Sequence, residues 1–345
     1  MQYLKVILNG VKELIFKGKL WRAKTIKLCS LSIMICVTAI ALTSCPDNNI
    51  PTIRIATNLW TGYETLYLAR SLGYYDQTPI KLTDYPSGSE EVKAYRNNEI
   101  EGAGLSIDQV LNLAVTQNDL SIITIMDFSN GADVILAKPE FKNMQALKGK
   151  KIGVESTALG AFFLTRALEK NNMTVKDIQI VSLELNEHER AYKTGKIDAV
   201  VTFGPPRAKL LELGAKLVFD SSQIPGEIVD TLVVRKDIIK KYPQVIQTLV
   251  NGRFKALEYL KQHPQDAANR IAPRTKVKPE QILDAFQGMK QPDLTENQEL
   301  LSQTNPILVT GMQKLVKVMV ENKLLSKPVD SPTILDDSFV KKAKI

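Results

Sequence analysis

The chain has 345 residues, with 45 basic and 37 acidic side chains and a formal net charge of +8. Residues 1–27 hold seven basic residues against one acidic residue, so only +2 of the charge remains for the chain from residue 45 onward. This argues against nucleic-acid binding, which needs clustered Lys and Arg. The length is sufficient for one large or two medium domains, and a total of two histidines argues against a histidine-rich metal site.

The N-terminal segment has the layout of a secretory signal: a basic start, an uncharged stretch over residues 28–44 and small residues at the end. The sequence Leu42-Thr43-Ser44-Cys45 resembles the bacterial lipobox, which implies cleavage before Cys45 and a diacylglycerol on its sulfur. Residues 1–44 are therefore predicted as signal peptide and 45–51 as a tether. Two alternatives stay open: an uncleaved membrane anchor, since residues 28–44 are at the lower limit for a span, or an ordinary thiol at Cys45.

The predicted processing determines the cysteine chemistry and the location. Cys29 and Cys36 would leave with the signal peptide, and lipid would occupy Cys45, so no disulfide is expected. The protein is then expected on the periplasmic side of a bacterial cell membrane, tethered by lipid. Its stability has to come from an ordinary apolar core.

Short β-branched runs alternate with longer segments of helical period through the first two thirds of the chain. This alternation predicts an α/β fold with mostly parallel sheets flanked by helices. The predicted strands are Ile53–Thr57, Ile80–Tyr85, Ala103–Leu105, Ile122–Ile125, Val134–Ala137, Lys151–Val154, Ile178–Leu183, Asp198–Phe203, Leu217–Phe219 and Leu232–Arg235.

The pattern changes after Arg235. Apolar residues at three- and four-residue steps between Val245 and Leu260 predict an amphipathic helix that ends before His263-Pro264. Further helices are predicted near Pro279–Met289, Glu296–Ser302 and Pro306–Asn322, so the C-terminal third should be helical.

Several predicted helices begin with the same local chemistry directly after a strand. Thr61–Glu64, Ser87–Glu90 and Ser106–Gln109 match the capping box, and Ser156-Thr157 starts a similar turn. In an open parallel sheet such turns gather at the carboxyl ends of the strands, where small molecules bind. The alternative for each is that the hydroxyl only satisfies backbone donors.

Two loops strengthen the case for a binding site. Asn58–Tyr63 places the large aromatics Trp60 and Tyr63 directly after a strand, and Asp127–Asp133 places polar groups and a glycine between two apolar strands. A tryptophan in this position can also be a core residue, so this alternative remains open.

Taken together, five segments resemble periplasmic substrate-binding proteins of ABC importers, most closely those for nitrate, sulfonates and taurine and those for thiamine-pyrimidine precursors. The resemblance runs from about Ile53 to Arg270. The segments are Ile53–Tyr63, Tyr67–Tyr75, Asp127–Leu136, Leu147–Val154 and Thr194–Pro205.

The resemblance implies the two-lobed fold of type II binding proteins. Lobe I would comprise residues 52–137 plus 235–345 and lobe II residues 138–234, with crossing strands near Leu136–Pro139 and Leu232–Arg235. A solute would be held between the lobes, close the hinge and be delivered by a monomer to an ABC permease. No cofactor or metal is implied.

The resemblance also implies a set of ligand contacts in the loops after the strands. In this sequence they are Trp60, Tyr63, Ser87, Ser89, Ser106, Asp127, Ser129, Asn130, Ser156, Thr157 and Phe203. The sequence departs from the family at Phe203-Gly204-Pro205, where many relatives have an acid before the proline.

The solute class stays open between a planar or nitrogen-bearing organic molecule and a sulfonate-like anion. Acids are plentiful near the inferred cleft and Arg207 is the clearest base, which favours the first. Enzyme motifs such as G-x-S-x-G, H-E-x-x-H and G-x-G-x-x-G are absent from the sequence, and His188 is expected to be solvated. A binding protein is therefore predicted, with a tethered sensor or a thiamine- or quinone-pathway-like enzyme as alternatives.

Overall fold

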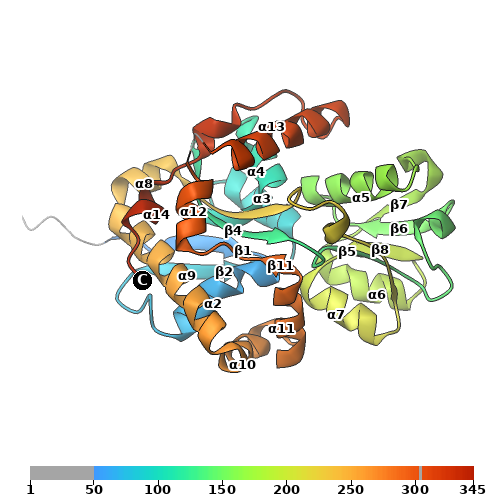
Figure 1. Ribbon diagram of the computed structural model, residues 1–345, viewed down its shortest axis with the longest axis horizontal. Helices are drawn as coiled ribbons and strands as arrows, with labels where there is room; N and C mark the ends of the chain where they lie inside the picture. The colour runs from blue at the N-terminus through green and yellow to red at the C-terminus, as the bar shows by residue number, and fades with distance from the viewer. Residues whose placement is uncertain (1–49, 303–304) are drawn as a thin grey trace, which may run out of the picture. The chain divides into compact units, whose positions relative to one another are not determined.

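A computed structural model describes residues 50–302 and 305–345 (Figure 1). The predicted signal peptide and Cys45 lie outside the described residues. From Pro51 onward the chain forms two lobes, each built on one β-sheet with helices packed against it. The predicted α/β class and two-lobed architecture are confirmed.

Lobe I is built on a sheet in which the described residues form six strands in the order β11-β4-β10-β3-β1-β2. The strands β1 and β2 and the strands β1 and β3 pair in parallel, while β10 runs antiparallel to both of its neighbours. The bounds are β1 Ile53–Thr57, β2 Ile80–Asp84, β3 Gly102–Ser106, β4 Leu120–Ser129, β10 Val229–Arg235 and β11 Met289–Lys290.

Helices cover both faces of this sheet. Helix α2 packs against α9 on one face and α4 packs against α13 on the other (Figure 1). The helices of lobe I are α2 Glu64–Ser71, α3 Gly88–Arg96, α4 Ile107–Ala114, α8 Lys236–Lys241, α9 Pro243–Gln262, α10 Pro264–Thr275, α11 Pro279–Gln287, α12 Leu294–Leu300, α13 Pro306–Glu321 and α14 Ser338–Lys342.

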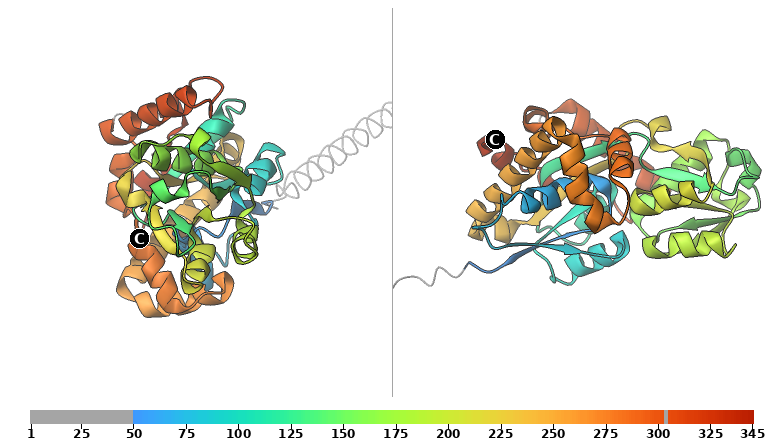
Figure 2. Two further views of the ribbon diagram at one scale, coloured as in Figure 1. Left: turned by 90° about the vertical axis from the view of Figure 1, so that its right-hand side faces the viewer. Right: turned by 90° about the horizontal axis from the view of Figure 1, so that it is seen from below.

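Lobe II is built on a second sheet, for which the described part of the chain supplies five strands in the order β7-β6-β8-β5-β9. Figure 2 shows this green-to-yellow half of the ribbon beside the half that holds the blue and orange-to-red segments. The bounds are β5 Val134–Ala137, β6 Lys151–Val154, β7 Gln179–Ser182, β8 Ala199–Thr202 and β9 Lys216–Asp220, with helices α5 Ala158–Lys170, α6 His188–Lys193 and α7 Gly204–Glu212.

The chain passes between the sheets twice, at residues 130–133 after β4 and at residues 221–228 before β10. Strand pairing therefore places Val134–Ala137 in the sheet of lobe II and Val229–Val234 in that of lobe I, a few residues from the predicted boundaries. Both sheets are mixed rather than mostly parallel, because β4, β5, β9 and β10 next to the crossings run antiparallel to their neighbours.

The local elements follow the sequence pattern closely. Each predicted strand corresponds to an observed one, and the predicted helix from Val245 lies within α9. The short strand β11 was not predicted, because its two residues follow the amphipathic pattern of α11. Between α11 and β11, the carbonyl of Gly288 accepts hydrogen bonds from the amides of Asn130 (2.8 Å) and Ala132 (3.0 Å). These bonds connect the C-terminal helices to the first crossing.

Candidate functional site

The loop after β1 brings an indole to the boundary between the lobes. The Trp60 side chain is 4% exposed, and its Nε1 donates to Oδ2 of Asp127 at 3.0 Å. Its backbone amide donates to Oδ1 of Asn58 at 2.8 Å. From lobe II, the ring of Phe203 meets the indole edge-on, with centroids 5.6 Å apart and an interplanar angle of 77°. Hydrogen bonds therefore hold Trp60 within lobe I, and its ring contacts lobe II through Phe203.

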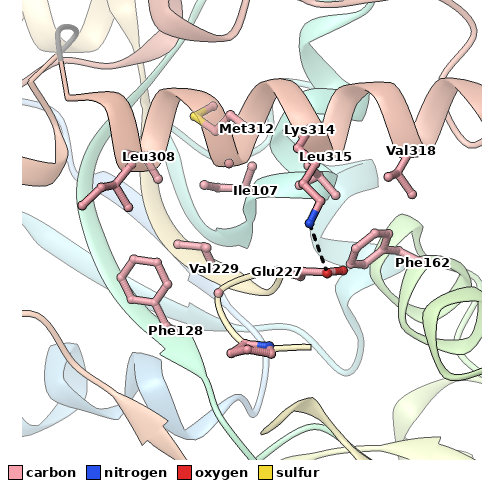
Figure 3. A pocket seen from close by; sticks show the side chains of 14 residues that line it. Ile107, Phe128, Phe162, Glu227, Val229, Leu308, Met312, Lys314, Leu315 and Val318 are labelled. Carbon is pink, nitrogen blue, oxygen red and sulfur yellow. Dashed lines mark ion pairs between the residues drawn. The ribbon is translucent and has the colours of Figure 1, made fainter. Parts of the chain in front are cut away.

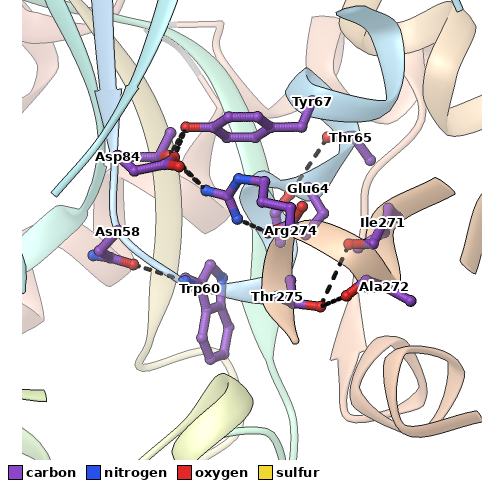
Figure 4. Close-up of polar contacts among 12 residues, drawn as sticks. Asn58, Trp60, Glu64, Thr65, Tyr67, Asp84, Ile271, Ala272, Arg274 and Thr275 are labelled. Atoms are coloured by element: carbon purple, nitrogen blue, oxygen red, sulfur yellow. Dashed lines mark hydrogen bonds and ion pairs between the residues drawn. The ribbon is translucent and has the colours of Figure 1, made fainter. Parts of the chain in front are cut away.

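A partly buried arginine, Arg274, lies close to this loop (Figure 4). Arg274 in α10 forms ion pairs with Glu64 and with Asp84, the latter at 2.8 Å. Its guanidinium also lies over the ring of Tyr67, 3.6 Å from the centroid. Because the carboxylate of Glu64 is fully buried, burial raises its pKa to about 7 against the lowering effect of Arg274. This network holds the N-terminal end of α2 in place, four residues after Trp60.

Residues of both lobes line a small pocket next to the indole. The pocket has a volume of about 10 Å³, which is the space of one water molecule. An organic solute can therefore enter only if the lobes move apart. The lining residues are Asn58, Trp60, Tyr63, Gln109, Asp133, Glu155, Leu159, Phe203 and Asp230.

Three carboxyls line this pocket, those of Asp133, Glu155 and Asp230. Tyr63 donates its hydroxyl to Oδ1 of Asp230 at 2.6 Å. Burial raises the pKa of Asp127 and of Asp133 to about 7, and it raises the pKa of Asp230 well above its usual range. Within the described part of the chain, Oδ2 of Asp133 has no hydrogen-bond partner. The pocket thus offers buried acceptor oxygens that a donor can still satisfy.

Two neighbours of the pocket extend the acidic cluster. Asp108 at the start of α4 and Glu91 in α3 are buried, and burial raises the pKa of Asp108 to about 7 and that of Glu91 well above its usual range. Glu91 accepts a hydrogen bond from Nδ2 of Asn58 at 3.2 Å through Oε2. Among the described residues, neither Oδ2 of Asp108 nor Oε1 of Glu91 has a partner. The cluster therefore favours positive charge or N–H donors over an anion.

The predicted ligand contacts do not all lie in one pocket. Trp60, Tyr63 and Phe203 line the pocket between the lobes. Ser89, Ser156 and Thr157 line a neighbouring groove of about 350 Å³, which Gln109 also borders. Ser129 and Asn130 line a different groove of about 450 Å³ near α12.

The remaining predicted contacts make local bonds. Ser87 caps α3 by accepting from the amide of Glu90 at 3.4 Å, and Ser106 donates to Oε1 of Gln109. Asp127 holds the indole of Trp60. Ser129 also bonds to Ser221 at 2.7 Å, which joins the two crossings.

Sequence reasoning did not select six of the residues that line the pocket, and it placed two bases wrongly. The six are Asn58, Gln109, Asp133, Glu155, Leu159 and Asp230. Gln109 was explained as a capping residue, and Asp230 lies inside an apolar run that gives no sign of a polar site. Arg207 pairs with Asp284 at 2.9 Å instead of lining the pocket. His188 is buried against Thr202 rather than solvated, and burial lowers its pKa to about 4.

A larger apolar cavity of about 210 Å³ lies beneath α13 (Figure 3). Phe128, Phe162, Met312 and further apolar side chains line it, and the Lys314–Glu227 ion pair at 3.8 Å lies beside it. It lacks the convergent carboxyls of the pocket between the lobes. That pocket is therefore the candidate site.

Residues 50–302 and 305–345 contain neither a candidate metal site nor a candidate membrane-spanning helix. In that part of the chain no three His, Cys, Asp or Glu side chains are grouped so that they could hold a metal ion. In the same residues no helix has both the length and the apolar character needed to cross a membrane.

Solved structures of binding proteins and of an enzyme share this fold. The alkanesulfonate-binding protein of Xanthomonas axonopodis pv. citri bound to MOPS superposes with a TM-score of 0.69 at 17% identity, covering 82% of this chain and 98% of that one. The ligand-binding component of an ABC-type import system from Staphylococcus aureus gives 0.70 at 15% identity, covering 86% and 99%. The desulfurization enzyme DSZB gives 0.65 at 16% identity, covering 85% and 98%, so the fold also occurs in an enzyme.

Sequence comparison gives relatives named as binding proteins. The taurine-binding periplasmic protein of Escherichia coli (strain K12) is 22% identical over 211 residues, which is 58% of this chain and just under two thirds (66%) of that protein. A protein of Bacillus subtilis (strain 168) named for binding aliphatic sulfonates is 21% identical over 294 residues, or 81% and 84% of the two chains. The model of the NMT1/THI5-like family matches residues 60–267, more than half of the sequence, and the chain belongs to this family.

Proposed function

We propose that the protein is the extracytoplasmic solute-binding component of an ABC importer and that it captures a small nitrogen-bearing organic molecule between its lobes. The named relatives, one called a periplasmic binding protein and the other named for binding aliphatic sulfonates, support the general role. The observation that carries the solute class is the unpartnered, buried Oδ2 of Asp133, in a pocket of the described residues that also holds Asp230 and Trp60.

The chemistry of the pocket distinguishes between the two solute classes left open by the sequence. Burial raises the pKa of Asp133 and of Glu155 to about 7, so both are partly ionised at neutral pH, and a sulfonate would bring a further negative charge next to them where burial leaves little water to screen it. A cation or an N–H donor instead supplies the partner that the buried Oδ2 of Asp133 lacks among the described residues. The faces of Trp60 and the ring of Phe203 add a surface suited to a planar or cationic group.

Capture proceeds by movement of the lobes. Since the pocket holds about 10 Å³, a solute enters when Phe203 and Trp60 separate and stays when they close over it. A solute that contacts both lobes binds the closed form more tightly than the open form and shifts the equilibrium toward closure. The closed form is then the one that docks on the permease.

The proposed location follows from the N-terminal segment. A lipid on Cys45 holds the protein on the periplasmic side of the cell membrane, beside the permease, and the protein acts as a monomer. A lipid anchor restricts diffusion to two dimensions, with a strength that depends on the number of acyl chains.

Calorimetric titration tests the proposed solute class. Benzamidine and 4-aminopyrimidine serve as planar nitrogen-bearing probes, and 1-propanesulfonate serves as the anionic probe. We expect binding of a nitrogen-bearing probe and at least about tenfold weaker binding of the sulfonate. Preferential sulfonate binding would contradict the proposal, and chemical conversion of the bound solute would favour the enzyme alternative.

The variant Trp60→Ala tests the location of the site. We expect it to weaken binding of the nitrogen-bearing probe at least about tenfold, since it removes the stacking surface. Because Trp60 is 4% exposed, a lower melting temperature is also expected, so affinity is measured where circular dichroism shows folded protein. Tyr259→Ala is the matched control, since Tyr259 lies on α9 away from the pocket and contacts His263.

A further inference from the structure

A carboxylate of lobe II occupies the N-terminus of a lobe I helix. Glu155 follows β6, is 6% exposed and accepts a hydrogen bond at Oε1 from the backbone amide of Gly88 at 2.7 Å. The amide of Ser89 points at the same oxygen from 3.4 Å. These amides open α3, so Glu155 connects the lobes by capping a helix across the cleft.

The N-terminus of α3 has the properties of an anion site. Free amides and the helix dipole favour negative charge there, and α3 is nine residues long. The hydroxyl of Ser89 donates to a second acid of lobe II, Glu184, at 2.7 Å. The donors that a sulfonate or carboxylate of a solute would use are thus taken by side chains of the protein itself.

The adjacent pocket gives an independent sign that a solute binds beside this contact. Glu155 and Asp133 line the same pocket, and Asp133 is 3% exposed. Among the described side chains, nothing bonds to Oδ2 of Asp133. A donor-bearing group can therefore bind at Asp133, while the amides of the helix N-terminus next to it already bond to the carboxyl group of Glu155.

From this arrangement we propose that Glu155 is a specificity-determining residue that takes the place of a solute anion. It holds the lobes together through α3 and excludes solutes with an acidic group from this helix N-terminus. A solute anion would have to displace Glu155 and would then lie beside Glu184, which accepts a hydrogen bond from Ser89. This inference rests on the proposed function, since it concerns the solute class of the same site.

The variant Glu155→Ala tests this role because it exposes the amides of Gly88 and Ser89. Calorimetric titration with 1-propanesulfonate is expected to show binding at least about tenfold tighter than in the wild type. Glu155→Gln keeps the size and one acceptor oxygen, so it should give a smaller gain. If Glu155→Ala does not fold, the sulfonate affinity of Glu155→Gln tests the inference. Unchanged sulfonate affinity in the folded variants overturns the inference.

Asp284→Ala is the matched control. Asp284 pairs with Arg207 across the lobes at 2.9 Å, away from α3. Its removal also breaks a contact between the lobes but leaves Glu155 in place, so no gain in sulfonate binding is expected. A gain equal to that of Glu155→Ala would mean that loosening alone admits the anion, and it would overturn the inference.

Titration of the same proteins with benzamidine separates this inference from the proposed function. If the wild type binds benzamidine but Glu155→Ala gains no sulfonate affinity, the role of Glu155 is rejected and the proposed function stands. If Glu155→Ala gains sulfonate affinity while the wild type binds neither benzamidine nor 4-aminopyrimidine, the role of Glu155 stands and the proposed solute class is rejected.

Discussion

The indole of Trp60 and the ring of Phe203 meet edge-on across the two lobes, with their centroids 5.6 Å apart. Both side chains are buried, and each is attached to the end of a strand in its own sheet. The contact therefore exists only while the lobes are together. A solute that enters here has to separate this pair and can then stack against either ring.

Gly204 provides a direct way to hold the lobes apart. An added Cβ at this lobe II position would lie 2.6 Å from the backbone oxygen of Leu59 in lobe I. We therefore expect Gly204→Ala to prevent full closure, which would increase the radius of gyration in small-angle X-ray scattering and weaken solute binding at least about tenfold.

Gly214→Ala is the control for backbone strain in that experiment. Gly214 has φ +85° and Gly204 has φ +49°, so alanine is strained at both, but a Cβ at Gly214 meets nothing within 4 Å. Closure and binding should be unchanged in Gly214→Ala. Equal effects of the two substitutions would show that strain, not the contact between the lobes, is responsible.

Arg274 is expected to contribute strongly to stability. Arg274→Ala leaves the fully buried carboxylate of Glu64 without its partner, which should lower the free energy of unfolding by about 3–5 kcal/mol. Urea denaturation measures this change. Lys241→Ala, which breaks an exposed pair with Asp237, should change it by less than about 0.5 kcal/mol. A loss below about 1 kcal/mol for Arg274→Ala would contradict the assigned role of the network.

Stability should fall as the pH rises from about 4 to about 7. Burial raises the pKa of Asp108, Asp127 and Asp133 to about 7, so in this range the folded protein binds more protons than the unfolded chain. The contribution of these groups to stability is complete below their pKa in the unfolded chain. It is lost as the pH rises through their pKa in the folded protein. Glu155, with a pKa of about 7, and Asp230 and Glu91, with pKa values raised by burial, act in the same direction.

Melting temperatures measured from pH 5 to pH 8 check this dependence. His188 opposes the trend, because burial lowers its pKa to about 4, but it is one group against several. Asp230→Asn imitates the protonated acid, so its melting temperature should fall less steeply with pH than that of the wild type. A melting temperature that rises across this range would show that the carboxyls are ionised and stabilised in the folded protein.

Cys45→Ala tests the proposed lipid anchor. Without the sulfur, no diacylglycerol can attach, so the precursor should stay uncleaved or the protein should leave the membrane fraction. Cell fractionation with immunoblotting measures both. A variant of normal mature size that remains in the membrane fraction would argue against lipid anchoring.

The sequence was sufficient to predict the strands, and the caps at Ser87 and Ser106, because β-branched runs and capping residues are local signals. The capping box predicted at Thr61–Glu64 was wrong, since Thr61 lies inside a 3-10 turn that follows Trp60. The sequence did not locate the two crossings between the lobes, since Val134–Ala137 and Val229–Val234 are mostly apolar runs that fit either sheet. It also gave no sign of the Glu155–Gly88 contact, which depends on how two lobes meet. Asp230 was missed because its orientation toward the cleft follows from the register of β10 against β3 and β4.

Native mass spectrometry of protein purified from its own host directly tests whether the cleft next to Trp60 holds a nitrogen-bearing solute. We expect a co-purifying organic molecule whose accurate mass gives a formula with nitrogen and without a sulfonate group, and whose occupancy falls in Trp60→Ala. A sulfonate-bearing adduct, or an adduct retained fully in Trp60→Ala, would contradict binding of such a solute at this site.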